Sequence, residues 1–325
     1  MDARDVRVQV EALADATWGL AVVSASAESG LLAALSTPRR LNEVAEAAAI
    51  TAELAERMLD VLIAVGVARR DGDAYVAIDG VRQILTDEGV AQLRAELRAT
   101  LWQSGDLVDR ATRRTLVAGW VHTDPDLLHA QGASGRAGAR TLASEGVRRL
   151  VGLVERLNAP TASFLDVGVG VGVIAIEMCR AYPALRVVGL EPALAPRREA
   201  LAQVAAAGLS DRIEIRNQRV EALTELEKFD LAYVPQVFLP EDAFLRGLRT
   251  VFSALRSGGW VTLPVISVPG ADLGPAVARL RNTLWGGGAR LAEEVAEAVR
   301  QAGFTQVQVR HVGGLRHAVV GRRPE

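Results

Sequence analysis

Three glycines at alternate positions are placed where a backbone could approach a ligand. Gly168, Gly170 and Gly172 follow the apolar run FLDV and precede the helical pattern VIAIEMCRAY. Glycine has no Cβ to obstruct a ligand, and a helix that opens at Gly172 directs free N–H groups toward an anionic part of it. Glu191 ends the next β-like run, RVVGL, where an acid suits a pair of ribose hydroxyls. The pattern indicates a nucleoside-containing cofactor on a Rossmann-like sheet; a turn without a ligand is the alternative.

The spacing of these glycines distinguishes between cofactors. Dinucleotide-binding turns follow G-x-G-x-x-G, whereas this turn reads D-x-G-x-G-x-G from Asp166, with Val173 where the third dinucleotide glycine would stand. The turn resembles the S-adenosylmethionine (SAM) loop of class I methyltransferases. Over roughly residues 160–323, the predicted strands and helices follow one another in the order of that family's sheet. Helical patterns cover 193–209, 241–259 with a Gly-Gly exit, and 290–304. A strand and loop cover 211–223, and β-like runs cover 228–234, 260–266, 305–312 and 317–323, the last two as an antiparallel pair.

This resemblance implies a role for each matching position. The glycines would line the methionine half of SAM, Asp166 would help to fix that end, and Glu191, with Pro192 beside it, would hold the ribose hydroxyls. The loop Gln218-Arg219-Val220 would lie along the adenine. An aspartate is usual in the family where Arg219 stands, so adenine contact would depend more on backbone N–H groups and apolar packing. The implied cofactor-binding residues are Asp166, Gly168, Gly170, Gly172, Glu191, Pro192, Gln218, Arg219 and Val220.

The first part of the chain has a mostly helical pattern. Thr51 is a suitable N-cap for a helix over 52–65, which Gly66 ends, and another helix, LNEVAEAAA, precedes it. Asp71-Gly72 between two β-like runs predicts a hairpin. Helix, helix, hairpin is the order of a winged helix-turn-helix. Together the two parts resemble the bacterial small-molecule O-methyltransferase family, whose front domain dimerises and roofs the substrate cleft. We therefore expect an α/β protein with a helical winged-helix domain over 1–157 and a SAM-binding Rossmann-like domain over 158–325.

A winged helix raises the possibility of DNA binding. The helix in the recognition position carries Glu53, Glu56 and Asp60 against Arg57 alone, which would repel phosphate. We therefore predict a dimerisation module, in which the apolar run over 18–35 packs on a partner chain. Burial of that run within its own subunit is the alternative. The expected assembly is a homodimer that binds no nucleic acid.

The residues after the fourth strand lack an expected catalytic group. In the O-methyltransferase family a histidine there acts as the base, but the text VPQVFLPEDAF at 234–244 has none, and Phe238 and Leu239 are apolar. Glu241 and Asp242 suit the start of the next helix, where acids complement the helix dipole. A neutral hydroxyl acceptor needs a base. Methyl transfer would then depend mainly on proximity and alignment, with an acceptor that ionises readily.

The segment GWVHTDPDLLHAQG at 119–132 holds two of the four histidines and lies where the family places its roof. His122 is our candidate for a replacement base, although Asp124-Pro125 is also an ordinary turn initiator. The other two, His311 and His317, lie in the last two strands and are expected to be structural or exposed. Tryptophans 102, 120 and 285 could line an aromatic pocket or pack in the core. The candidate substrate-cleft residues are Trp120, His129, Gln131, Gln236 and Phe238.

Composition narrows the possible functions. A net charge of −2 gives no overall attraction to nucleic acid or acidic membranes, and no uncharged run reaches the ~18 residues of a membrane span. The single cysteine, Cys179, excludes a disulfide framework and favours a cytoplasmic location. No cluster with metal-ligand spacing is visible. We predict a SAM-dependent methyltransferase for a small molecule of secondary metabolism. The alternatives are a SAM-binding homologue that performs cyclisation, decarboxylation or hydroxylation, and a SAM-sensing DNA-binding regulator.

Overall fold

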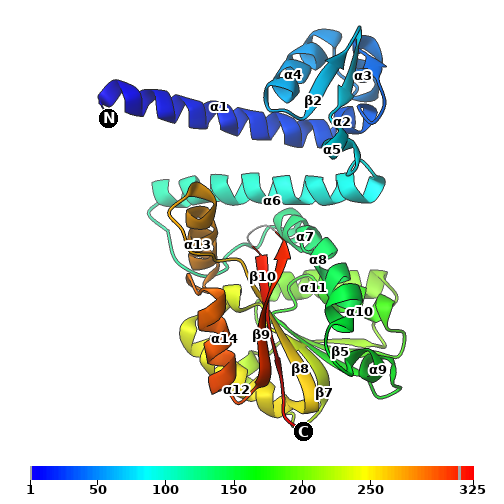
Figure 1. The fold of residues 1–325 in the computed structure, drawn as a ribbon, viewed down its shortest axis with the longest axis vertical. Coiled ribbons are helices and arrows are strands. Elements are labelled where there is room, and N and C mark those ends of the chain that lie inside the picture. The colour runs from blue at the N-terminus through cyan, green and yellow to red at the C-terminus, as the bar shows by residue number, and fades with distance from the viewer. Residues whose placement is uncertain (1, 314–315) are drawn as a thin grey trace. The chain divides into compact units, whose positions relative to one another are not determined.

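The computed structural model describes residues 2–313 and 316–325, and the chain divides into two compact units, residues 1–109 and 110–325 (Figure 1). The division falls earlier in the chain than the predicted domain boundary after residue 157, because the helices before that residue pack with the second unit. Where the methyltransferase fold itself begins stays a prediction. Within the described part of the chain, no helix combines the length and apolarity needed to cross a bilayer.

The first unit contains the helix, helix and hairpin order expected from the sequence. Its helices are α1 (Ala3–Glu28), α2 (Leu31–Ala34), α3 (Leu41–Ala47), α4 (Ala52–Ala64), α5 (Asp79–Arg82) and most of α6 (Asp87–Thr112). Its antiparallel sheet has the order β1-β3-β2, from Arg39–Arg40, Ala74–Ala77 and Ala68–Asp71. The side chain of Thr51 accepts the Leu54 N–H at 3.2 Å, which confirms the predicted N-cap.

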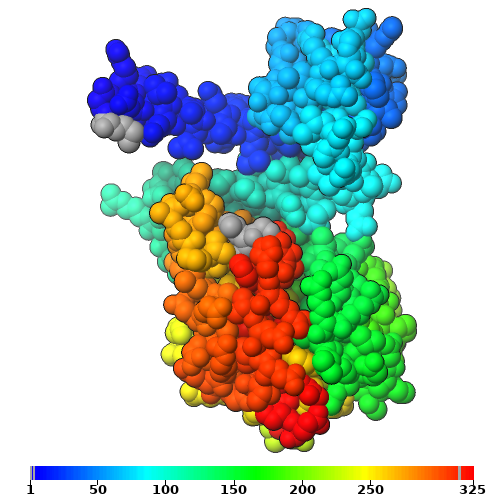
Figure 2. Space-filling model, in the orientation of Figure 1, coloured from blue at the N-terminus to red at the C-terminus, as the bar shows by residue number. Residues whose placement is uncertain are grey.

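The predicted dimerisation run over 18–35 has two different environments. Leu31 and Leu35 are buried in the core of their own unit, among residues of α3, α4 and the hairpin. Trp18, in contrast, is 73% exposed on α1. The dark-blue α1 extends away from the globular part of its unit, as Figure 2 shows. Burial within the subunit therefore accounts for the second half of the run, and the exposed apolar surface lies nearer the N-terminus.

The second unit is a seven-stranded sheet with helices on both faces. The strand order is β6-β5-β4-β7-β8-β10-β9, parallel except for β10, which runs antiparallel to β8 and β9. The strands are β4 (Ser163–Val167), β5 (Arg186–Leu190), β6 (Ile213–Arg216), β7 (Phe229–Tyr233), β8 (Leu255–Val265), β9 (Thr305–Gly313) and β10 (Arg316–Arg322). The helices are α7 (Pro125–Ser134), α8 (Arg136–Thr141), α9 (Leu153–Asn158), α10 (Val173–Ala181), α11 (Leu194–Ala206), α12 (Glu241–Ala254), α13 (Leu273–Trp285) and α14 (Ala292–Gln301), with a π-helical turn (Leu142–Gly146) after α8 and short 3-10 turns η2 (Val220–Ala222) and η3 (Gln236–Phe238).

Alternate residues of each strand enter two separate cores. Phe164 and Val187 pack with α9 and α10, whereas Leu165 and Val188 pack with α12 and α14 on the other face. Strand side chains alternate between the faces of a sheet, so a strand covered on both faces reads as a continuous apolar run. The predicted strands were therefore recognisable from their composition.

The sequence prediction was wrong at one helix end and missed one helix. The helix expected over 241–259 ends at Ala254, and residues 255–259 belong to β8. Leu255 pairs with Phe229 on β7, which places this segment in the sheet, and Gly258 has a left-handed φ of +72°, which an α-helix does not allow. Helix α13 was not predicted.

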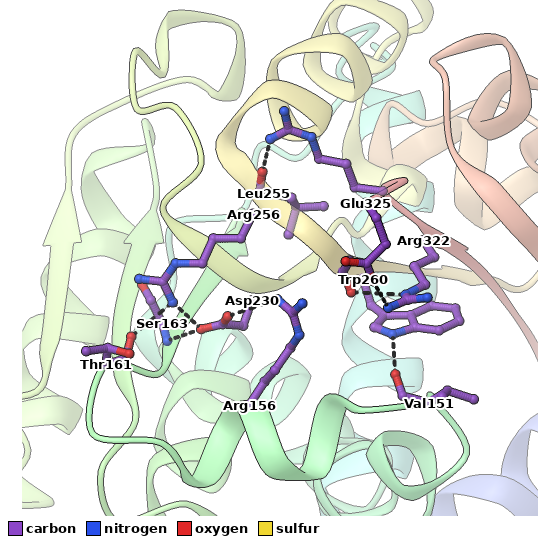
Figure 3. Close-up of polar contacts among 12 residues, drawn as sticks. Val151, Arg156, Thr161, Ser163, Asp230, Leu255, Arg256, Trp260, Arg322 and Glu325 are labelled. Carbon is purple, nitrogen blue, oxygen red and sulfur yellow. Dashed lines mark hydrogen bonds and ion pairs between the residues drawn. The ribbon is translucent and has the colours of Figure 1, made fainter.

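An arginine network ties together the amino ends of the central strands (Figure 3). The buried Asp230 of β7 accepts the Ser163 N–H at 3.0 Å and pairs with Arg256 at 2.6 Å. Arg256 also donates to the carbonyl of Thr161, and Arg156 of α9 lies 3.7 Å from the same carboxylate. A buried carboxylate needs such partners. This network fixes one end of the sheet, and the glycine turn follows the opposite, carboxyl ends of the strands.

Candidate cofactor and acceptor site

The glycine turn connects β4 to α10 in a backbone conformation that favours glycine. Gly168, Gly170 and Gly172 have φ values of +62°, +59° and +89°, all left-handed. Residues with a Cβ disfavour left-handed φ values, so the backbone conformation of the turn explains why glycine stands at these three positions. A Cβ on Gly170 would point into open space, where its nearest neighbour is the Gly168 carbonyl oxygen at 3.9 Å. The turn therefore offers bare backbone beside space that a ligand can occupy.

Glu191 links the end of β5 to the glycine turn. Its carboxylate is buried and accepts the Gly170 N–H at 3.1 Å and the Ala193 N–H at 2.9 Å. Burial raises the pKa of this carboxyl, and the two N–H groups and the charge of Arg197 oppose that effect. A carboxylate has about four lone-pair sites, so two backbone bonds leave room for two hydroxyl donors. The ribose role implied for Glu191 would use these two remaining sites, and it stays a prediction.

Asp166 is a buried acid without a well-formed hydrogen bond. Its side chain is 1% exposed, and neither oxygen has a hydrogen-bond partner among the described residues. Burial raises the pKa of this carboxyl to about 8, the charge of Glu191 adds to the rise, and the Ala175 N–H partly opposes it. Such a group is stabilised by a cation brought to it. Asp166 and the glycine turn together fit a ligand that carries positive charge, as SAM does on its sulfonium and ammonium groups.

The remaining cofactor candidates lie around the ends of β5 and β6. Pro192 and Arg219 are exposed, Gln218 donates to the carbonyl of Ala222 at 2.7 Å, and the side chain of Val220 is in the core beneath α12. The structure thus leaves mainly the backbone of this loop for an adenine contact. Sequence reasoning missed Arg197, whose guanidinium donates to the carbonyls of Glu191 and Pro192 and to Asn217 Oδ1 at 3.0–3.1 Å. Arg197 therefore joins the two loops.

Four aromatic rings from distant parts of the sequence form an aromatic cluster: Trp120, His122, Phe238 and Trp285. The Trp120 ring lies 4.7 Å from His122 and 5.4 Å from Phe238, and Phe238 stacks on Trp285 at 5.2 Å. Trp120 also packs against Leu128, Val171 and Val173, which belong to α7, the glycine turn and the start of α10. The tertiary structure therefore brings Trp120, His122 and Phe238 together beside the glycine turn, with Trp285 as a fourth member.

The loop after β7 is held by an arginine that sequence reasoning did not identify. Arg290 donates to Gln236 O and Oε1 at 3.0 and 2.9 Å and to the Leu239 carbonyl at 2.9 Å, and it pairs with Glu241 at 2.7 Å. Gln236 is 1% exposed and also donates to the Pro264 carbonyl. The interactions of Gln236 are therefore structural ones, which orient the loop that carries Phe238.

The other candidates occupy different surroundings. His129 on α7 lies 2.8 Å from Glu199 on α11, Gln131 is half-buried on α7, and the His311 and His317 rings are 5.3 Å apart on β9 and β10. Trp102 lies in the first unit, where the Arg98 guanidinium covers its ring at 4.6 Å. Cys179 is a free, buried thiol in α10. Among residues 2–313 and 316–325, no three His, Cys, Asp or Glu side chains gather as a metal site requires.

Comparison with known proteins identifies the glycine-turn region. Residues 164–259 match the family described as methyltransferase domain. Residues 164–259 therefore form a methyltransferase domain. It contains the glycine turn, Glu191 and the loop that Arg290 holds. A search among curated proteins gives no match.

Solved structures of methyltransferases resemble the whole chain. The S-adenosylmethionine-dependent methyltransferase SibL, in its apo form, is 21% identical over 96% of this chain and 98% of its own, with a TM-score of 0.68. An O-methyltransferase family protein from Burkholderia thailandensis is 17% identical over 98% of both chains, with a TM-score of 0.66. Human N-acetylserotonin methyltransferase, in complex with SAM, is 15% identical over 100% of this chain and 99% of its own, with a TM-score of 0.67. At these identities the likeness shows the fold, which is that of class I SAM-dependent methyltransferases.

We expect the methyltransferase domain to lose SAM binding when the turn or its acid is changed. Gly170→Val places a side chain in the open space beside the turn and should abolish measurable binding. Glu191→Ala should weaken binding by roughly 1–3 kcal/mol, the scale of a lost charge-assisted hydrogen bond. Calorimetry on both variants measures the effect. Gly208→Val is the control. Gly208 follows α11, has a left-handed φ of +68° and has open space around its Cβ position, so the substitution causes the same backbone strain away from the glycine turn. Unchanged affinity in either test variant would remove the assigned role of that residue.

SAM affinity should also depend on the protonation of Asp166. Because its pKa is about 8, Asp166 is mostly neutral at pH 6–7 and must release a proton to pair with a cation. The association constant should therefore rise with pH between 6 and 7, by a factor approaching ~10, and binding should release protons. Calorimetry in buffers of different ionisation enthalpy measures this release. Asp166→Asn should bind more weakly and lose most of the pH slope; an equal slope in both proteins would contradict the assignment.

Proposed function

We propose that this protein transfers the methyl group of S-adenosylmethionine to a small molecule of secondary metabolism. The observation that carries the proposal is the buried Asp166 carboxyl, which has no hydrogen-bond partner in the described residues and lies at the end of β4, before three left-handed glycines. A cationic nucleoside cofactor fits this combination. The match to a methyltransferase domain and the fold shared with SAM-dependent methyltransferases support the same conclusion.

The domain's residues have distinct parts in holding the cofactor. Asp166 and the backbone of the glycine turn would hold the methionine end, and Glu191 would accept the ribose hydroxyls. The loop Gln218-Arg219-Val220 would lie along the adenine, mainly through its backbone. When bound, S-adenosylmethionine supplies an electrophilic methyl group on a sulfonium sulfur. The protein's task is then to bring an acceptor atom into line with that group.

The aromatic cluster gives the acceptor side of the proposal. Phe238 stands in the loop after β7, where the resembled family places its base, and the rings around it are Trp120 and Trp285. Flat apolar surfaces orient an acceptor but remove no proton. We therefore propose that alignment carries the reaction and that the acceptor is a phenolate, thiolate, amine or enolate. The half-buried His122, 4.7 Å from Trp120, is the candidate if a base takes part.

Replacing His122 separates these two mechanisms. Under alignment alone, His122→Ala should keep near-normal kcat, and the rate should follow the acceptor's own pKa across a substrate series. A loss of at least ~100-fold in kcat, with folding and SAM binding intact, would instead make His122 the base. The pH profile would then lose a limb near ~6.5. Transfer of tritium from methyl-labelled SAM measures the rate. If no acceptor of these four classes gains a methyl group while SAM binds, the methyltransferase proposal fails.

We also propose a cytoplasmic homodimer that forms through the first unit. Val6, Val10 and Leu13 recur on one side of α1 and are 45–59% exposed, and Trp18 follows them at 73%. An apolar stripe on a long helix suits a second copy of the chain, since obligate interfaces are apolar and bury on the order of 2,000 Å². Helix α4 offers little to DNA, because Glu56 and Asp60 pair with its Arg57 at 2.5 and 2.7 Å.

Light scattering tests the dimer. Wild-type protein should show twice the 34.6 kDa monomer mass at micromolar concentration. The double variant Val10→Glu/Leu13→Glu should show the monomer mass, because it places two charges within the apolar stripe. A wild-type monomer would contradict the proposal.

A further inference from the structure

The segment that carries Trp285 contains three cations and no acid. Residues 273–292 include Arg279, Arg281 and Arg290 but neither aspartate nor glutamate. Arg279 donates to the carbonyls of Val268 and Gly270 at 2.9 and 2.8 Å. Arg290 is occupied by Glu241 and by the loop after β7. Two of the three guanidinium groups therefore have structural partners.

Arg281 is the exception. It forms no ion pair and no hydrogen bond with any residue in the ranges 2–313 and 316–325. It is nevertheless half-buried, with its guanidinium carbon 4.8 Å from the centre of the Trp285 ring. Burial lowers the pKa of Arg281, and the charge of Arg316 lowers it further. An arginine stays protonated under such conditions. Arg281 is therefore a partly desolvated cation, close to the positive charge of Arg316, and no anion among the described residues balances it.

The ring below Arg281 belongs to the aromatic cluster. Trp285 is 5% exposed and stacks on Phe238, which meets Trp120 edge to face at 5.4 Å. Stacking over an indole offsets part of the desolvation of a guanidinium, on the order of 1 kcal/mol, but satisfies none of its five N–H donors. A flat apolar surface and an unbalanced planar cation are thus adjacent.

We propose that the methyl acceptor is an aromatic acid, whose ring packs against the aromatic cluster and whose carboxylate pairs with Arg281. This proposal rests on the methyl-transfer function given above. The guanidinium fork matches a carboxylate with two parallel hydrogen bonds, which fixes orientation as well as charge. Pairing at one end of a flat molecule would orient the opposite, nucleophilic atom, which is what a mechanism based on alignment requires.

A purely structural role for Arg281 makes a different prediction. Stacking on Trp285 would stabilise α13 whether or not a ligand binds. In that case, aromatic acids and their uncharged amides would bind equally well. The two interpretations therefore differ in a measurable preference.

The experiment uses full-length protein saturated with S-adenosylhomocysteine, the demethylated product of SAM. The probes are hydroxybenzoic, hydroxynaphthoic and hydroxyanthracene carboxylic acids, each paired with its primary carboxamide, and calorimetry measures their binding. At least one acid should bind about 10-fold or more tightly than its amide, the scale of a hydrogen bond to a charged group. Arg281→Met should abolish this preference, and Arg281→Lys should keep part of it because the charge remains.

Arg249→Met is the matched control, since Arg249 lies on the exposed side of α12; it should keep the full preference. If Arg281→Met fails to fold in a thermal scan, Arg281→Gln replaces it, because glutamine keeps hydrogen-bond donors without the charge. No preference for an acid over its amide at any ring size would overturn the proposal. So would a full preference in the Met or Gln variant. Failure of the wild type to bind S-adenosylhomocysteine would instead contradict the proposed function, so the two failures are distinguishable.

Discussion

The carboxylate of Glu191 joins the two segments on which the rest of the site depends. It leaves the end of β5 and accepts the N–H of Gly170, in the middle of the turn after β4. Its second oxygen accepts the Ala193 N–H, just before α11 begins at Leu194. One buried acid therefore sets the position of the glycine turn relative to the neighbouring strand. Since the turn's glycines are all left-handed, few other residue types could follow the same path.

The two acids of the site differ because their surroundings differ. Glu191 has two backbone donors and the nearby charge of Arg197, which oppose the effect of burial on its pKa. Asp166 has only the weak opposition of one backbone N–H, so its pKa reaches about 8. The protein itself therefore provides partners for the first acid, whereas the second is left with little to balance its charge. This difference is the reason for proposing that Glu191 binds the ribose hydroxyls and Asp166 the charged end of the cofactor.

Arginines position several segments of the second unit, at both ends of its sheet. Arg256 fixes the amino ends of the strands through Asp230, Arg197 joins the loops after β5 and β6, and Arg290 holds the loop after β7. Each donates to backbone carbonyls, which a planar group with five donors can do from one position. Arg281 lacks such partners within the described residues, and that contrast is the reason to assign it a ligand.

Local signals in the sequence were enough to predict the Rossmann-like sheet, the antiparallel final strands, the Thr51 N-cap and the glycine turn. These features depend on short-range chemistry: apolar runs for strands buried on both faces, a side chain that caps a helix, and glycines where φ must be positive. The same reasoning placed the end of α12 too late and missed α13, because strand pairing with Phe229 and packing decide those regions. Only the tertiary structure brought Trp120, Phe238 and Trp285 together and showed which arginines have partners. Contacts between residues this far apart in the chain leave no periodic trace in a single sequence. The glycine turn could therefore be predicted from local residue types, whereas the aromatic cluster is decided by packing.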